Sequence, residues 1–191
     1  MNNNLNPKGF KKYFPNRNEN KKNDVYDFFI SADESVIYKK NKNRPSKIKE
    51  LLESDAAKND FKGILSGEGI TPGLRPHIVN GFDYEEDGSY KSEFIHGFRL
   101  DLIANYELTE KLFSDIIIQC QNLLGSLEIA AAEEELFGDW ALHNLVYSLK
   151  YERIINVDLE GFVTYKPLPK WANFEVILDW VASIEASKSI Q

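Results

Sequence analysis

Two short polar segments in the last third of this 191-residue chain carry side chains suited to phosphate chemistry. Asp139 is followed five residues later by Asn144, and a short apolar run follows the asparagine. Fourteen residues after Asn144 a second apolar run ends at Asp158, and Glu160 stands two positions further on. Phosphoryl transfer from ATP needs a carboxylate that orients the accepting hydroxyl, and amide and carboxylate oxygens that hold magnesium on the phosphates. The spacing therefore predicts a phosphotransfer site built from two loops.

Residues 137–146 and 154–161 together resemble the catalytic and metal-binding loops of the protein kinase-like superfamily. They are most similar to its small-molecule and bacterial branch, with aminoglycoside phosphotransferases, choline kinases and lipopolysaccharide kinases. The pattern there runs roughly His-Gly-Asp-x-x-x-x-Asn and then Ile-Asp-x-Glu. Phe137 replaces the histidine, and the positions that match are Gly138, Asp139, Asn144, Asp158 and Glu160. The alternative is a pair of ordinary polar loops in an α+β domain, because Asp-x-x-x-x-Asn alone is a common pattern.

The resemblance implies a role for each matching polar residue. Asp139 would be the catalytic base or the group that orients the hydroxyl. Asn144 and Asp158 would hold Mg²⁺ on the phosphates of ATP. Glu160 would support these ligands or bind a second metal ion. Losing any of these residues should reduce the rate more than the stability, because phosphoryl transfer depends mainly on positioning and charge neutralisation.

Residues 24–31 and 35–40 are rich in β-branched and aromatic side chains and flank a short turn, which predicts a β-hairpin. A further strand is expected at residues 9–14. In the second strand of the hairpin, Val36-Ile37-Tyr38-Lys39 resembles the kinase strand whose lysine contacts the α- and β-phosphates of ATP. Strand alternation places Lys39 on the same face as Ile37. Lys39 is therefore a candidate for both catalysis and ATP binding.

Pro45 suits the first turn of a helix that runs to about Lys58. In kinases the corresponding helix supplies a glutamate that pairs with the strand lysine. Glu53 is the candidate for this role, and Glu50 is the alternative. An acidic residue near a helix start is also an ordinary complement to the helix dipole.

A second hairpin is expected from residues 77–82 and 90–95, around an acidic turn that contains a glycine. The segment 93–100 resembles the hinge that joins the two lobes of a kinase, which typically reads Glu-aromatic-Ile-x-Gly-x-x-Leu. The hinge backbone binds adenine in that family. Glu93 and Ile95 are accordingly the candidate adenine-binding positions.

Thr109 can cap a long helix from Glu110 to about Glu135, whose apolar residues recur at helical spacing. This helix leads the chain to Asp139, as the central helix of a kinase C-terminal lobe does. A final helix is expected over residues 173–186, with an apolar stripe that packs on the long helix.

The sequence departs from the family at two further points. It has no Gly-x-Gly-x-x-Gly loop, and only Gly9 and the polar residues 16–23 offer a flexible loop in its place. This departure favours modest nucleotide affinity or a pseudokinase. About 30 residues follow Gly161, so the activation segment and the helices that bind peptide substrates are absent from this sequence. We therefore expect a small acceptor rather than a peptide.

The net charge of −7 is unevenly distributed along the chain. The first 50 residues carry 12 Lys+Arg and 6 Asp+Glu, whereas the remainder carries 11 and 24. Basic segments attract nucleic acids or membrane surfaces, but these lysines alternate with asparagines and form no stripe with aromatic residues. Since the rest of the chain is strongly acidic, we expect no nucleic-acid partner.

The composition bounds the class of protein. With 42% apolar and 13% aromatic residues the chain can bury a core, which excludes a disordered chain. No run approaches the roughly 18 apolar residues of a membrane span, and the start of the sequence does not read as a signal peptide. The single cysteine, Cys120, excludes an internal disulfide and a cysteine zinc cluster. We therefore expect a cytoplasmic protein; the alternative is an effector exported without a cleaved signal, whose sequence would show the same features.

Together these features predict an α+β, two-lobed protein kinase-like fold. Residues 1–95 would form an N-terminal lobe with an antiparallel sheet and a helix, irregular in part over residues 1–23. Residues 96–191 would form a reduced, mostly helical C-terminal lobe. The expected function is ATP- and Mg²⁺-dependent phosphotransfer to a hydroxyl of a sugar, glycolipid precursor or other small metabolite. The alternatives are a pseudokinase that binds a protein partner, and a minimal effector-type protein kinase.

Overall fold

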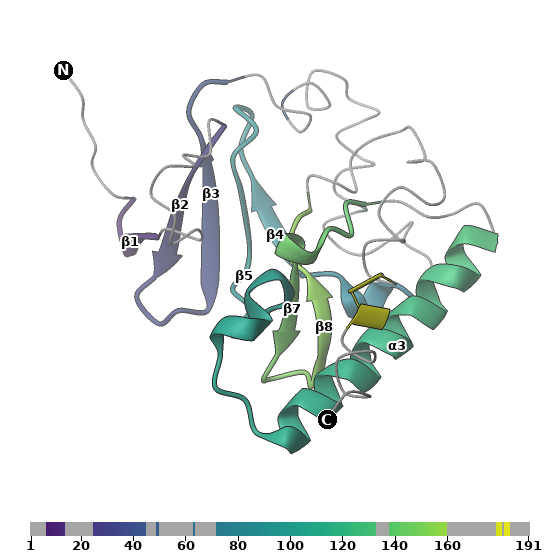
Figure 1. The fold of residues 1–191 in the computed structure, drawn as a ribbon. Coiled ribbons are helices and arrows are strands. Elements are labelled where there is room, and N and C mark those ends of the chain that lie inside the picture. The colour runs from purple at the N-terminus through teal and green to yellow at the C-terminus, as the bar shows by residue number, and fades with distance from the viewer. Residues whose placement is uncertain are drawn as a thin grey trace. The chain divides into compact units, whose positions relative to one another are not determined.

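The described part of the chain is an α+β structure with two antiparallel sheets and one long helix (Figure 1). The structure is a computed structural model, and it describes residues 7–13, 25–44, 49, 63, 72–132, 138–159, 179–180 and 182–183. The chain divides into two compact units. The first unit comprises residues 1–69 and 80–94, and the second comprises residues 70–79 and 95–191. The domain boundary near residue 95 stays a prediction.

The first unit contains a five-stranded antiparallel sheet with the strand order β1-β2-β3-β5-β4. Its strands are β1 (Phe10–Tyr13), β2 (Tyr26–Ser31), β3 (Val36–Asn41), β4 (Gly81–Tyr84) and β5 (Tyr90–Glu93). The hairpin predicted from the aromatic and β-branched runs is confirmed as β2 and β3. The strand expected near residues 9–14 is confirmed as β1. Lys39 therefore lies in a central strand, between β2 and β5.

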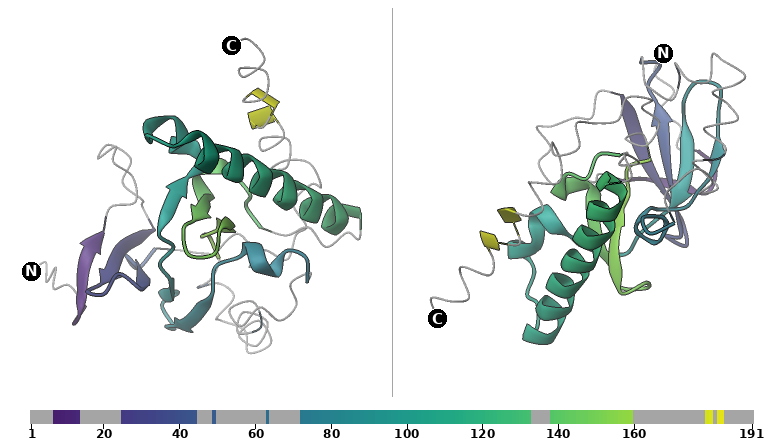
Figure 2. Two further views of the ribbon diagram at one scale, coloured as in Figure 1. Left: turned by 90° about the horizontal axis from the view of Figure 1, so that it is seen from below. Right: turned by 90° about the vertical axis from the view of Figure 1, so that its right-hand side faces the viewer.

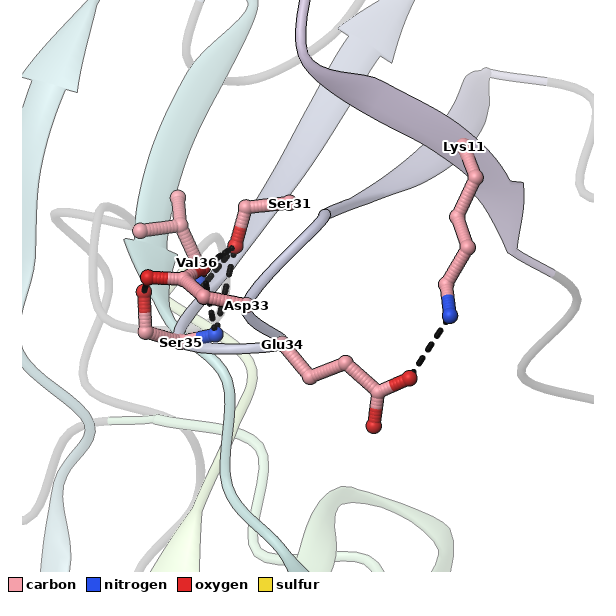
Figure 3. A network of polar contacts seen from close by, with 6 residues as sticks. All are labelled: Lys11, Ser31, Asp33, Glu34, Ser35 and Val36. Carbon is pink, nitrogen blue, oxygen red and sulfur yellow. Dashed lines mark hydrogen bonds and ion pairs between the residues drawn. The ribbon is translucent and has the colours of Figure 1, made fainter.

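A polar network fixes the turn between β2 and β3 (Figure 3). The Ser31 hydroxyl donates to Oδ1 of Asp33 at 2.5 Å, and the Ser35 hydroxyl donates to Oδ2 at 2.8 Å. These hydrogen bonds lower the pKa of Asp33 to about 2, and the one from Ser31 contributes most to that shift. The Lys11 ammonium of β1 lies 2.6 Å from the Glu34 carboxylate in the same turn. The turn thus sets the β2–β3 register that carries Lys39.

The second predicted hairpin forms, but the strand predicted at residues 77–82 is wrong in position. Residues Arg75–His77 form a 3₁₀ helix, η1, and the strand begins only at Gly81. Nδ1 of the buried His77 lies 2.8 Å from the carbonyl oxygen of Ile154, and the Val79 N–H donates to the Asn156 carbonyl oxygen at 3.0 Å. Residues 77–79 therefore belong to the second unit, because their polar groups bond to its sheet.

The second unit contains a three-stranded antiparallel sheet with the order β6-β7-β8. Its strands are β6 (Gly97–Arg99), β7 (Leu145–Ser148) and β8 (Arg153–Asn156), and the 3₁₀ helix η2 (Leu100–Asn105) follows β6. The apolar runs after Asn144 and before Asp158 thus form the strands β7 and β8. At Gly97 an added Cβ would lie 1.8 Å from the carbonyl oxygen of Tyr147, so β6 and β7 approach too closely for any side chain there.

The long helix α3 (Glu110–Ala132) packs against β8 (Figure 2). Thr109 begins it as predicted, because its hydroxyl accepts from the Leu112 N–H at 3.2 Å and its carbonyl oxygen accepts from the Phe113 N–H at 2.9 Å. The buried face matches the predicted apolar pattern and consists of Ile116, Ile117, Cys120, Leu123, Leu124, Leu127 and Ala130. In the described residues, no helix combines the length and apolarity needed to span a membrane.

Two other predicted helices fall largely outside the described residues. The helix expected from Pro45 to Lys58, with both candidate glutamates, is one of them. The final helix over residues 173–186 is the other, although residues 179–180 and 182–183 within it are helical. Their packing stays a prediction.

Candidate functional site

Asp139 lies in the described segment that leads into β7. Gly138 before it is buried and has φ of 100°, a left-handed conformation that favours glycine. Oδ1 of Asp139 accepts a hydrogen bond from the Ala141 N–H at 3.1 Å. The short 3₁₀ helix η3 (Leu142–Asn144) follows, and the Asn144 N–H donates to the Ala141 carbonyl oxygen at 2.8 Å. These bonds fix the half-buried Asp139 carboxylate relative to Asn144.

The side chain of Asn144 turns back onto this loop. Its Nδ2 donates to the backbone carbonyl oxygen of Asp139 at 3.3 Å. A planar amide carries its nitrogen and its oxygen on opposite sides. The bond to Asp139 therefore directs the Asn144 Oδ1 atom away from the Asp139 carbonyl, and Oδ1 is the atom that a magnesium ion would need.

Strand pairing brings Asp158 beside Asn144. Leu145 of β7 pairs with Asn156 of β8. One step further out, the Val157 N–H donates to the Asn144 carbonyl oxygen at 2.9 Å. Asp158 is the next residue along the chain, so the β7–β8 ladder delivers it to the end of the hairpin where Asn144 lies. The sequence order alone did not determine this proximity.

Asn156 joins the two loops, and sequence reasoning missed it. Its side chain is fully buried. Nδ2 donates to the Asp139 carbonyl oxygen at 2.8 Å, and Oδ1 accepts from the Asp158 N–H at 2.9 Å. We call Asp139, Asn144, Asn156 and Asp158 the loop network. The available signal was a polar residue ending the apolar run Ile154-Ile155, directly before the predicted metal-binding segment.

The loop network suits a magnesium ion by the chemistry of its donors. Magnesium prefers hard oxygen ligands and is usually held by one or two carboxylates together with substrate phosphates. Asn144 supplies an amide oxygen, which its bond to Asp139 orients, and Asp158 supplies a carboxylate. No group of three or more His, Cys, Asp or Glu side chains that could hold a metal ion occurs within the described ranges. The third candidate ligand, Glu160, lies outside those ranges.

Lys39 occupies a half-buried position on β3 in the first unit. It pairs with Phe28 on one side and with Tyr90 on the other. Its ammonium nitrogen lies 5.1 Å from the centroid of the Tyr90 ring, within the range of a cation–π interaction. Ile37 and Lys39 share a face of the sheet, as predicted. The lysine's proposed partners, Glu53 and Glu50, lie outside the described residues.

The candidate adenine-binding positions lie at the end of β5 and just after it. Glu93 ends β5, and its N–H donates to the Asn80 carbonyl oxygen at 2.8 Å. Ile95 belongs to the second unit, and its side chain is buried. Because the Ile95 side chain is apolar and buried, any polar contact with adenine would come from its backbone. The adenine-binding role of both positions stays a prediction.

Comparisons with known proteins give no family for this chain. No protein-family model matches it, and neither does any curated protein. Among solved structures, a chain titled "PpkA-294 apo form" matches with a TM-score of 0.46 and 11% identity. That match covers 100% of this chain and 66% of the other. A match at this level shows neither the fold nor the function of this chain.

Proposed function

We propose that this protein is an ATP- and Mg²⁺-dependent phosphotransferase with a two-lobed protein kinase-like fold. Its acceptor would be a hydroxyl of a sugar, a glycolipid precursor or another small metabolite in the cytoplasm. The observation that carries the proposal is the loop network, in which Asn156 connects the loop of Asp139 to Asp158. A carboxylate for the hydroxyl and two oxygen ligands for a metal ion then lie at one end of the β7–β8 hairpin.

In this proposal the two oxygens of Asp139 have different roles. Oδ1 accepts the hydrogen bond from Ala141, which fixes the orientation of the carboxylate. Oδ2 would accept the hydrogen of the acceptor hydroxyl and hold that oxygen in line with the phosphate being transferred. Restricting the carboxylate in this way lowers the entropic cost of positioning the hydroxyl.

Asn144 and Asp158 would hold the magnesium ion. When bound, magnesium neutralises charge on the phosphates of ATP. Asn144 contributes Oδ1, and its Nδ2 keeps the side chain anchored to the Asp139 carbonyl. Asp158 contributes its carboxylate, and the Asp158 N–H donates to Oδ1 of Asn156. Glu160 would support these ligands or bind a second metal ion.

The remaining roles follow from the resemblance to kinases. Lys39 would contact the α- and β-phosphates, with Glu53 orienting it. A lysine fixed in the middle of a sheet has less conformational freedom to lose on binding than one in a loop. Glu93 and Ile95 would contribute backbone groups to adenine.

A pseudokinase that binds a protein partner is the second candidate, and one observation favours it. The chain has no Gly-x-Gly-x-x-Gly sequence, and Gly9, with φ of 83°, is the only glycine that precedes β1 in the sequence. Backbone N–H groups of glycine-rich loops normally cradle phosphates. A chain without that cradle could retain the fold and bind nucleotide weakly or not at all.

A thermal-shift titration with ATP, with and without Mg²⁺, tests the proposal. A ligand that binds only the folded state raises its melting temperature by mass action. We expect stabilisation by ATP that increases with Mg²⁺, and an Asp158→Asn variant that loses the increase. Asp115→Asn on α3 is the matched control, because it removes the same charge outside the loop network. An unchanged melting temperature of the wild type at millimolar Mg-ATP would contradict the enzyme assignment and favour the pseudokinase.

A panel of acceptors tests the substrate class. Phosphate transfer from labelled ATP should be measurable to a sugar or a small hydroxylated metabolite and weak to generic protein substrates. Labelling of one protein partner, without turnover of any small acceptor, would reverse this choice while leaving the phosphotransferase assignment intact.

A further inference from the structure

We infer that Asn156 is a positioning residue that couples the loop of Asp139 to the backbone of Asp158, and that it sets the geometry of the magnesium ligands through both. The inference deepens the proposed function and rests on it. Asn156 contacts neither the acceptor nor the metal ion in this scheme. It would act only through the residues to which it is hydrogen-bonded.

Both ends of the Asn156 amide are used, and each binds a different segment. The donor, Nδ2, lies 2.8 Å from the Asp139 carbonyl oxygen, and the acceptor, Oδ1, lies 2.9 Å from the Asp158 nitrogen. The side chain is fully buried, so water does not compete for these bonds. One rigid planar group therefore fixes the distance between two backbone positions that belong to separate loops.

The backbone of Asn156 is itself held from two sides. It pairs with Leu145 of β7, and its carbonyl oxygen accepts from the Val79 N–H at 3.0 Å. Ile78 forms a parallel bridge with Asn156 on the same side. The sheet thus fixes the backbone from which the Asn156 side chain extends. Rotation of that backbone therefore cannot relax the two side-chain hydrogen bonds.

An apolar residue would fill the same buried position without a polar group that needs partners. Ile154 and Ile155, in the same strand, are buried apolar residues of this kind at their own positions. Burying an amide is unfavourable unless all of its strong hydrogen bonds are formed. Here the amide links the two loops that carry the candidate base and metal ligand. Such a link matters for catalysis because small displacements of a reacting group reduce the rate of phosphoryl transfer strongly.

Two substitutions of Asn156 separate the contributions of its two side-chain hydrogen bonds. Asn156→Ala removes both bonds. Asn156→Asp keeps an acceptor for the Asp158 N–H but replaces the donor to the Asp139 carbonyl with a second oxygen. Ser148→Ala is the matched control, because Ser148 is a buried polar residue of β7 whose hydroxyl accepts from Tyr151 N–H at the opposite end of the hairpin.

Amide hydrogen exchange of the unliganded protein, resolved by residue with NMR, reads the coupling directly. In Asn156→Ala we expect exchange at the Asp158 N–H and in the Asp139 loop, reported by the Ala141 and Asn144 N–H groups, to accelerate at least tenfold. In Asn156→Asp only the loop should accelerate. If the buried charge prevents Asn156→Asp from folding, the alanine variant still shows whether Asn156 couples the two loops. Exchange rates in Asn156→Ala that match those of Ser148→Ala would overturn it.

Kinetics then distinguish positioning from a merely structural role. We expect Asn156→Ala to lower kcat at least tenfold and to raise the Mg²⁺ concentration needed for half-maximal rate, with little change in KM for the acceptor. Normal kcat and Mg²⁺ dependence, with accelerated exchange, would show that Asn156 is structural only. A wild-type protein that does not respond to Mg-ATP would defeat the proposed function, whereas unchanged exchange in Asn156→Ala would defeat this inference alone.

Discussion

The side-chain amide of Asn156 donates to the backbone carbonyl oxygen of Asp139 at 2.8 Å, although 17 positions separate the two residues in the sequence. Asn144 donates to the same carbonyl oxygen at 3.3 Å. One backbone oxygen thus accepts hydrogen bonds from Asn144, the last residue of η3, and from Asn156, the last residue of β8. These two hydrogen bonds hold the backbone of Asp139 and do not use its carboxylate, whose catalytic role stays a prediction.

Replacing Asp139 by asparagine should separate catalysis from folding. The substitution keeps the backbone carbonyl oxygen that Asn144 and Asn156 contact, and an amide oxygen can still accept from the Ala141 N–H. We expect an unchanged melting temperature and a loss of ATP hydrolysis or transfer of roughly a hundredfold or more. Steady-state kinetics and a thermal melt of the same preparation check this. Wild-type turnover in the variant would show that Asp139 is only a loop residue.

Gly97→Ala should destabilise the second unit. The added Cβ would lie 1.8 Å from the Tyr147 carbonyl oxygen, so β6 and β7 would have to separate. Because backbone atoms rather than a flexible side chain must move, we expect a loss of about 2 kcal/mol or more in the free energy of unfolding. Urea denaturation measures it. A loss below about 0.5 kcal/mol, the usual range for a neutral surface change, would contradict the close approach.

Gly125→Ala should stabilise the protein rather than destabilise it, and it serves as the matched control for Gly97→Ala. Gly125 lies within α3, and apart from the backbone of its own helix an added Cβ would meet no heavy atom within 4 Å. Alanine restricts the unfolded chain and favours the helix, so we expect a gain of about 0.5–1 kcal/mol in the free energy of unfolding. The same urea experiment reads both variants. Destabilisation by Gly125→Ala would mean that this face of α3 is covered.

His77 should make the protein less stable in acid. Burial lowers its pKa from the ordinary value of 6.5 and outweighs its hydrogen bond to the Ile154 carbonyl oxygen. Below about pH 6.5 the unfolded chain therefore binds a proton that the folded protein does not, so stability falls as the pH drops towards the lowered folded-state pKa. Above pH 6.5 His77 is neutral in both states, and its contribution does not change.

His77→Asn isolates this effect, because asparagine can donate to the same carbonyl oxygen but does not titrate. Urea denaturation at several pH values between about 5 and 8 should show a shallower acid-side decline in the variant than in the wild type. Parallel pH profiles for the two proteins would exclude His77 as a source of the pH dependence.

Cys120 should report unfolding through its reactivity. Its thiol is fully buried on α3, and burial raises its pKa to about 12. Because the thiolate is the reactive form, a thiol reagent should modify the native protein very slowly and the urea-unfolded protein within minutes. The Cys120→Ala variant controls for labelling elsewhere. Rapid labelling of the native protein would mean that α3 opens readily.

The sequence determined the local elements of this protein. Runs of β-branched and aromatic residues around a short turn predicted the β2–β3 hairpin, and helical spacing with Thr109 as a cap predicted α3. The order and spacing of Asp139, Asn144 and Asp158 also pointed to the two loops that Asn156 joins, whereas the role of these residues as metal ligands stays a prediction. These features depend on residues close together in the chain, so their signal is present in short windows of sequence.

The tertiary structure alone decided which of these pieces meet. The strand predicted to start at residue 77 was wrong because residues 77–79 bond to β8, a segment that no local pattern connects with them. In the sequence, Asn156 stands out only as a polar residue that ends an apolar run. Its bond to the Asp139 carbonyl oxygen depends on the β7–β8 register and not on neighbours in sequence. A side-chain hydrogen bond depends on which atoms a non-local strand pairing brings within about 3 Å, and that distance is a property of the folded chain.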